Sequence, residues 1–192
     1  MTTKLTREKW LNSAAKIMAK TIFKKAEIKV PRDYRISCGW PSSGGRAKRN
    51  RTIGQCFPRS MSQDAKAEMF VSPTVENPLD VLAILAHEMI HMVDDCKAGH
   101  RQPFGRMARA IGLEGKLTAT TAGEDLTIEL KGIIKTLGKY PHRKLVFKNR
   151  NKQSTRMLKL ECQDCGCIAR MSQAWLEAAT FCPCCGGEEI EK

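Results

Sequence analysis

The sequence predicts an α+β protein in two parts, a domain of helices packed on a short β-sheet and a small zinc ribbon that follows it. Two observations lead to this fold class. Segments with apolar residues every three or four positions, typical of helices, alternate with short segments of strand-like composition. Six of the nine cysteines then crowd into the last 31 residues, which is typical of a metal-binding module.

The bulk composition limits the class of protein further. With 42% hydrophobic and 28% charged residues, the chain has too many apolar side chains for a disordered protein. No run approaches the roughly 18 consecutive apolar residues that a membrane span needs. Residues 1–29 carry Lys and Arg throughout and lack a continuous apolar segment. We therefore expect no secretory signal, no membrane association, and a cytoplasmic or nucleoid-associated location.

Positive charge is concentrated in two stretches of the chain. The formal net charge is +13, and residues 130–160 contain ten Lys and Arg and no acidic residue. Residues 34–63 hold six more basic residues, again without an acid. Such blocks indicate a polyanionic partner, most often nucleic acid, and we expect DNA. The alternative is a solvated basic surface that only aids solubility. The predicted contact residues are Lys144, Lys148, Arg150, Lys152 and Arg156.

The predicted elements follow one another with short connections. A Ser-, Gly- and Arg-rich loop at 41–50 joins the first two strands, and residues 112–123 are expected to form a loop. The tract 143–156 is polar and basic, which predicts a linker. The expected elements are a helix at 7–25, strands at 34–40, 51–57 and 68–72, a long helix from 78, helices at 103–111 and 125–137, and hairpin strands at 157–160 and 168–171.

The long helix that begins at Pro78 is apolar over much of its circumference, so we expect it to be buried. Asn77 is a favourable N-cap, Pro78 suits the first helical position, and Asp80 can complete a capping box. Gly99 ends the segment. This helix carries the residues with the clearest chemistry.

The motif His87-Glu88-Met89-Ile90-His91 lies in that helix. Positions i and i+4 share one face, so both imidazoles can bind one zinc ion. Glu88 flanks the metal, where a carboxylate can take a proton from water that attacks a carbonyl. The alternative is a set of polar side chains satisfied in the core without metal. Burying three such groups in an apolar helix is costly, whereas metal binding explains all three together.

A catalytic zinc site needs a third protein ligand and one open position. His100 is the best candidate, because Gly99 can bring the chain back toward the metal. The alternative for His100 is a surface histidine beside a helix end. Glu114 and Glu124 are carboxylate alternatives. His142 follows Pro141, and we expect it to face the substrate or to be exposed.

The cysteines of the last segment form two CxxCG motifs, Cys162 to Gly166 and Cys182 to Gly186, sixteen residues apart. Glycine after the second cysteine permits the tight turn that directs amide N–H groups toward the thiolates. Four thiolates without an open position predict a structural zinc site, which supplies folding energy to a module too small for its own core. The expected ligands are Cys162, Cys165, Cys182 and Cys185. Cys184 can replace Cys185 if the motif shifts, and a redox CxxC pair is a further alternative.

The pattern of residues around the histidine motif resembles the SprT-like family, which includes the Spartan-type proteases that digest proteins crosslinked to DNA. The resemblance covers residues 1–142, and many members also end in a zinc ribbon. It implies a small zincin fold at 1–142, a linker at 143–156 and a ribbon at 157–192. It also implies zinc ligation by His87, His91 and His100, with Glu88 as the catalytic base. The gap between His91 and His100 is shorter than in better-known members, so the helix must end early. The matching residues are His87-Glu88-x-x-His91, Gly99-His100, Phe104, Ile111-Gly112-Leu113 and Tyr140-Pro141-His142.

Three functions are compatible with these motifs. The first is a zinc-dependent endopeptidase with one catalytic and one structural zinc ion, acting on DNA-bound or DNA-crosslinked proteins. The second is a zinc-binding, nucleic-acid-associated regulatory protein without peptidase activity. The intact Glu88 argues against it, because a vestigial site does not need the base. The third is a zinc hydrolase that acts on a non-peptide amide.

Overall fold

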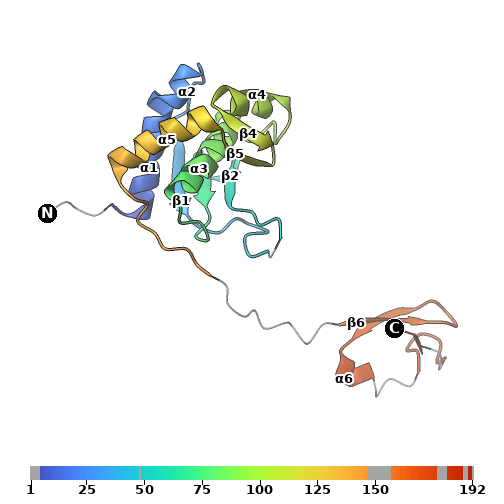
Figure 1. Cartoon of the computed structure of the whole chain (residues 1–192). Coiled ribbons are helices and arrows are strands. Elements are labelled where there is room, and N and C mark those ends of the chain that lie inside the picture. The colour runs from blue at the N-terminus through green and yellow to red at the C-terminus, as the bar shows by residue number, and fades with distance from the viewer. Residues whose placement is uncertain (1–4, 48, 147–156, 177–180, 188–189, 192) are drawn as a thin grey trace. The chain divides into compact units, whose positions relative to one another are not determined.

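The computed structural model describes residues 5–47, 49–146, 157–176, 181–187 and 190–191. The chain divides into two compact units, Met1–Val146 and Phe147–Lys192, and its secondary structure is α+β as predicted (Figure 1). Within the described part of the chain, no helix is long and apolar enough to cross a membrane. Four of the predicted nucleic-acid contacts lie outside the described residues: Lys148, Arg150, Lys152 and Arg156.

The first unit begins with two helices, where the sequence predicted one. Helix α1 spans Arg7–Lys20 and α2 spans Ile22–Lys25, with a break at Thr21. Thr6 caps α1, since its hydroxyl accepts a hydrogen bond from the amide of Lys9. The buried Trp10 donates its indole N–H to the carbonyl of Gly138, at 3.1 Å. This bond ties α1 to the segment near residue 138.

Three strands form a mixed sheet in the order β1-β3-β2. They are β1 (Tyr34–Cys38), β2 (Gly54–Phe57) and β3 (Ala67–Val71), with the short 3-10 helix η1 (Arg59–Met61) between the last two. Strand β3 pairs in parallel with β1 and antiparallel with β2. Strands β1 and β2 are shorter than the sequence predicted, whereas β3 keeps its predicted length of five residues and begins one residue earlier. Because β3 lies between the other two strands, β2 is at an edge of this sheet.

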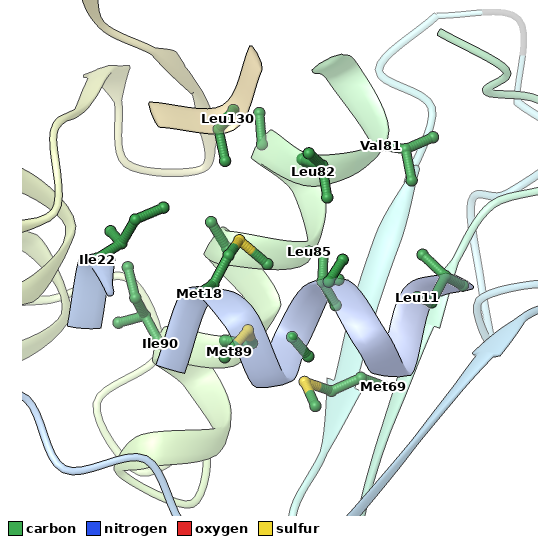
Figure 2. Close-up of a cluster of buried hydrophobic side chains, with 14 of the residues drawn as sticks. Leu11, Met18, Ile22, Met69, Val81, Leu82, Leu85, Met89, Ile90 and Leu130 are labelled. Atoms are coloured by element: carbon green, nitrogen blue, oxygen red, sulfur yellow. The ribbon is translucent and has the colours of Figure 1, made fainter. Parts of the chain in front are cut away.

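Helix α3 (Pro78–Val93) crosses the centre of the unit and packs against β2, β3, α1 and the last helix of the unit. Its N-cap is Asn77, as predicted, and the side chain accepts a hydrogen bond from Leu79 N–H. Figure 2 shows side chains of α1, α3 and β3 gathered in one apolar cluster. This cluster contacts α3 on several sides and so fixes its position in the unit.

The segment after α3 differs from the prediction in one element. Helix α4 (Gln102–Ala110) and α5 (Glu124–Leu137) occupy the expected places. The predicted loop between them is wrong, because it forms an antiparallel hairpin of β4 (Leu113–Lys116) and β5 (Ala119–Ala122). These strands are mostly exposed, so they lack the apolar alternation that marks a half-buried strand. Strand β5 packs against α3, which brings it to the histidine motif.

The second unit holds the expected hairpin and two further elements. Strands β6 (Leu158–Cys162) and β7 (Ile168–Met171) are antiparallel, and β8 (Ile190–Glu191) pairs with the other side of β6. A short helix, α6, spans Gln173–Leu176. Among the described residues of this unit, the buried side chains are Leu160, Cys162 and Cys182. The apolar core that the described part of this unit provides is small.

Candidate metal centres

His87 and His91 lie one turn apart on α3 and face the same way. The packing of α3 fixes their backbone, and the buried ring of Phe104 on α4 supports their side chains. The Phe104 ring stacks on His91 with centroids 4.4 Å apart, and it also contacts His87 at 4.8 Å and His100 at 5.2 Å. One aromatic ring therefore restricts the orientation of all three imidazoles.

The turn after α3 returns the chain to these two histidines. The helix ends at Val93, and Asp95, Cys96 and Gly99 all have positive φ angles of 56°, 60° and 54°. Hydrogen bonds hold this unusual backbone. Asp94 accepts from the amide of Ala98 at 2.9 Å, and Asp95 accepts from the backbone and guanidinium of Arg59 at 2.9 and 3.0 Å. The helix thus ends early, as the short spacing predicted, and three left-handed residues reverse the chain after it.

This reversal brings His100 to the other two imidazoles. Nε2 of His100 lies 3.2 Å from Nε2 of His87 and 3.2 Å from Nε2 of His91. A single ring N–H cannot donate well to two partners at once. Two nitrogen ligands on a tetrahedral zinc ion, each at about 2.0–2.1 Å, lie roughly 3.3–3.4 Å apart. The observed spacing therefore fits three imidazoles that share one metal ion, and the donor set can hold one.

The ionisation of the three histidines also suits a metal ion. Burial lowers the pKa of His87 to about 3 and that of His91 to about 4, and the neighbouring imidazoles add to both shifts. Burial also lowers the pKa of His100. All three rings are therefore neutral at pH 7 and offer a lone pair, which is the form that binds metal.

Glu88 lies next to this cluster, and its side chain is only 5% exposed. Burial raises the pKa of its carboxyl group to about 8, and Cys96 adds to the shift. A cation held by the histidines would oppose this shift, because an opposite charge favours the carboxylate. The first residue of β2, Gly54, leaves room for the group. A Cβ at Gly54 would lie 2.4 Å from Oε1 of Glu88 and 2.6 Å from Cγ2 of Ile84.

Thr120 is a site residue that the sequence analysis missed. Its Oγ1 lies 2.8 Å from Nδ1 of His87, whose Nε2 faces the other two histidines. If Nε2 binds a metal ion, Nδ1 carries the proton and the threonine hydroxyl accepts it. Thr120 belongs to β5, in the segment predicted to be a loop. Because one threonine 33 residues from the motif carries no sequence signal, only the hairpin reveals it.

The three histidines and Glu88 open into a cleft of about 750 Å³. Strand β2 forms one wall through Gly54, Gln55 and Cys56, and the β4–β5 turn lines the cleft as well. His100 is the exposed member of the cluster, whereas His91 is 9% exposed. An ion bound by the three histidines would therefore be accessible to water and substrate from the cleft.

The other residues considered for this site lie elsewhere. Within the described part of the chain, neither Glu114 nor Glu124 belongs to the group of converging donors. Nε2 of His142 lies 2.9 Å from the carbonyl of Pro73, so its ring is hydrogen-bonded to the backbone. Lys144, a predicted nucleic-acid contact, forms an ion pair with Glu76 at 3.5 Å.

The second candidate centre is the cysteine cluster of the ribbon, formed by Cys162, Cys165, Cys182 and Cys185. The sulfur atoms of Cys162 and Cys185 are 3.7 Å apart, and those of Cys165 and Cys182 are 3.8 Å apart. These distances are too long for disulfides. Two thiolates on a tetrahedral zinc ion, each at about 2.3 Å, lie roughly 3.8 Å apart. The four sulfurs therefore fit a shared metal ion.

The turns of the two motifs have the expected geometry. Gly166 and Gly186 adopt positive φ angles of 70° and 75°. The amide of Cys184 donates to the sulfur of Cys182 at 3.4 Å. The backbone amides of Cys185 and Cys184 lower the pKa of the Cys182 thiol to about 6, which favours the thiolate that binds metal. Cys185, and not Cys184, belongs to the cluster.

The comparisons with known proteins add no identification. No protein-family model matches the chain, and the searches of curated proteins and of solved structures gave no significant match. The geometry of the two centres and the residue patterns are therefore the features that indicate a function.

Proposed function

We propose that this protein is a zinc-dependent endopeptidase with a small zincin-type, SprT-like domain. The observation that carries the proposal is the convergence of three neutral imidazoles beside a buried carboxylate, at the base of an open cleft. A structural zinc site needs no cleft and no adjacent acid, whereas a hydrolytic site needs both. The cysteine cluster, which has four ligands, is proposed to hold a structural zinc ion.

The roles of the site residues follow from this arrangement. Zinc held by His87, His91 and His100 would polarise a carbonyl and lower the pKa of water toward about 7. Glu88 would take the proton of the attacking water, and its burial restricts competing solvent. Thr120 would keep His87 in the tautomer that leaves Nε2 free. Strand β2 has a strand neighbour on one side only, so its free edge could pair with an extended peptide.

Glu88→Gln tests this function. We expect cleavage of an unfolded protein substrate to fall by about 10²–10⁴-fold, because the amide cannot accept the proton. The zinc content and the fold should remain unchanged, since Glu88 is not in the donor cluster. Glu161→Gln is the matched control, an exposed acid of the second unit that does not line the cleft and should tolerate the same change. Wild-type cleavage by Glu88→Gln would refute the mechanism.

The substrates are proposed to be proteins bound or crosslinked to DNA, by resemblance to the SprT-like family. The net charge of +13 supports a polyanionic partner. The alternative is a zinc-binding, nucleic-acid-associated regulatory protein, and the third candidate is an amide hydrolase with non-peptide substrates. A wild-type protein that holds zinc in both centres and cleaves no protein, with or without DNA, would favour one of these two.

A further inference from the structure

A second concave surface lies on the unit Met1–Val146, and it shares no lining residue with the metal cleft. It is a groove of about 900 Å³ between the two N-terminal helices and the segment 27–34. We call it the basic groove. Its polar lining is mostly cationic, and Glu27 is the acidic residue among those that line it.

Five cations line the basic groove: Lys16, Lys20, Lys24, Lys29 and Arg32. All five are exposed, and none of them forms an ion pair with another described residue. Some other basic residues of this unit are neutralised by acidic partners. Arg35 pairs with Asp64 and Glu68, and Lys25 pairs with Glu129. Like charges that line one groove repel each other, so this arrangement favours an anionic ligand that relieves the repulsion.

The floor of the basic groove is apolar. Ala19, Ile28, Val30, Pro31 and Tyr34 line it and are half-buried. A cationic rim around an apolar floor with an aromatic ring matches a single-stranded nucleic acid. Its phosphates contact the cations, and its unpaired bases pack on the floor. In a duplex the bases are paired and stacked inside the helix, so they could not pack on the apolar floor of the groove.

We propose that the basic groove binds single-stranded nucleic acid. This inference deepens the proposed function, because it places a nucleic-acid contact on the domain that carries the histidine centre. It does not require peptidase activity, and it is separate from the predicted contacts at 143–156. An acidic protein segment is the competing ligand, and it would use the cations without needing unpaired bases.

The test uses the full chain in the Glu88→Gln background, so that cleavage cannot influence the result. The probes are a labelled dT₁₅ strand, its duplex with dA₁₅, and a poly-glutamate peptide, titrated over a salt series. The groove variant is Lys16→Gln/Lys20→Gln/Lys24→Gln. The matched control, Lys9→Gln/Lys97→Gln/Arg106→Gln, removes three exposed cations of the same unit that line neither the basic groove nor the metal cleft and lie outside the block 130–160. Thermal denaturation checks that both variants remain folded.

We expect the groove variant to bind dT₁₅ at least tenfold more weakly than the control. Its slope of log affinity against log salt should be shallower by about 2, because about 0.7 is lost per phosphate contact on a single strand. Tyr34→Leu should weaken dT₁₅ binding about fivefold or more and leave duplex binding unchanged, because only unpaired bases stack. The difference in dT₁₅ affinity between the groove variant and the control should persist when Lys148, Arg150, Lys152 and Arg156 are also changed to Gln.

Equal losses in the groove variant and the control would mean that binding follows net charge, and the proposal would be wrong. Duplex or poly-glutamate binding as strong as dT₁₅ binding, and equally reduced in the groove variant, would overturn the assignment to single strands. Neither result would touch the peptidase proposal, which Glu88→Gln tests separately.

Discussion

The two candidate metal centres of this protein are built in opposite ways. The histidine centre takes its ligands from a buried helix and from the turn after it, and it opens into a cleft. The cysteine centre takes its four candidate ligands from two tight motifs, and they include two buried and two exposed cysteines. In the first, the fold positions the ligands. In the second, we expect a shared metal ion and its four thiolates to hold the fold.

The burial of the two units supports this contrast. In the unit with the histidine centre, α1, α3 and β3 share a large cluster of buried apolar side chains. In the ribbon, the described buried side chains are one leucine and two of the ligand cysteines. Since apolar burial is what stabilises a small unit, we expect the folding of the ribbon to need a metal ion far more than the folding of the larger unit does.

Removing a ribbon ligand should therefore have the largest effect. Cys182→Ser is expected to lower the zinc content from two ions to one and to unfold the ribbon, because three thiolates cannot replace the missing core. The signals of the unit Met1–Val146 should stay in place. Elemental analysis and ¹H–¹⁵N NMR spectra check both outcomes. Folded ribbon signals in the variant would show that the comparison is wrong.

The matched change in the histidine centre is His100→Ala. This variant should also lose one zinc ion, yet both units should stay folded, because His100 is exposed and the cluster around α3 does not need it. If the variant keeps two zinc ions, then a carboxylate such as Glu114 or Glu124 acts as the third ligand. Unfolding of the larger unit would show that this centre is structural as well.

The sequence was most informative where the signal is local. The Asn77 cap, the helix with His87 and His91, and the CxxCG turns are each defined within a few residues, and all appear as predicted. The first helix is interrupted at Thr21, and no Gly or Pro there indicates the break in the sequence. Asp95 and Cys96 adopt left-handed conformations that non-glycine residues rarely show, so only Gly99 could suggest the reversal.

Features that depend on tertiary contact could not be predicted. The β4–β5 hairpin is exposed on most positions, so its sequence shows no strand period. Thr120 meets His87 only because that hairpin packs on α3. The role of Gly54 depends in the same way on where Glu88 lies. Such residues contact the site from segments that are distant in the sequence. A single sequence does not show which distant segments are close in space.

Gly54→Ala should have the next largest effect and should act only on the histidine centre. The added Cβ would lie 2.4 Å from Oε1 of Glu88, so the carboxylate must move. A misplacement of this size can reduce catalysis about 100-fold, and we expect that loss in kcat/KM with both zinc ions retained. Gly132→Ala is the control, because nothing lies within 4 Å of its added Cβ. If Gly54→Ala and Gly132→Ala were equally active, the position of Glu88 would not matter for catalysis, and its assigned role would be wrong.

The smallest expected effect concerns the support of one ligand. Thr120→Val keeps the shape of the side chain and removes the oxygen that lies 2.8 Å from Nδ1 of His87. Without that acceptor, the ring loses its fixed tautomer, and zinc affinity of the histidine centre should fall about 10–100-fold. Competition with a zinc-chelating dye measures this loss, and the cysteine centre serves as the internal reference.

Two companion variants decide whether the hydroxyl is the cause. Thr120→Ser restores the acceptor and should recover most of the affinity. Thr121→Val makes the same change at the exposed neighbouring position of β5, which forms no hydrogen bond with His87 in the described part of the chain, and should leave the affinity unchanged. If Thr120→Val binds zinc as tightly as the wild type, the hydrogen bond does not orient His87. Equal losses in the two valine variants would instead assign the effect to the stability of the hairpin.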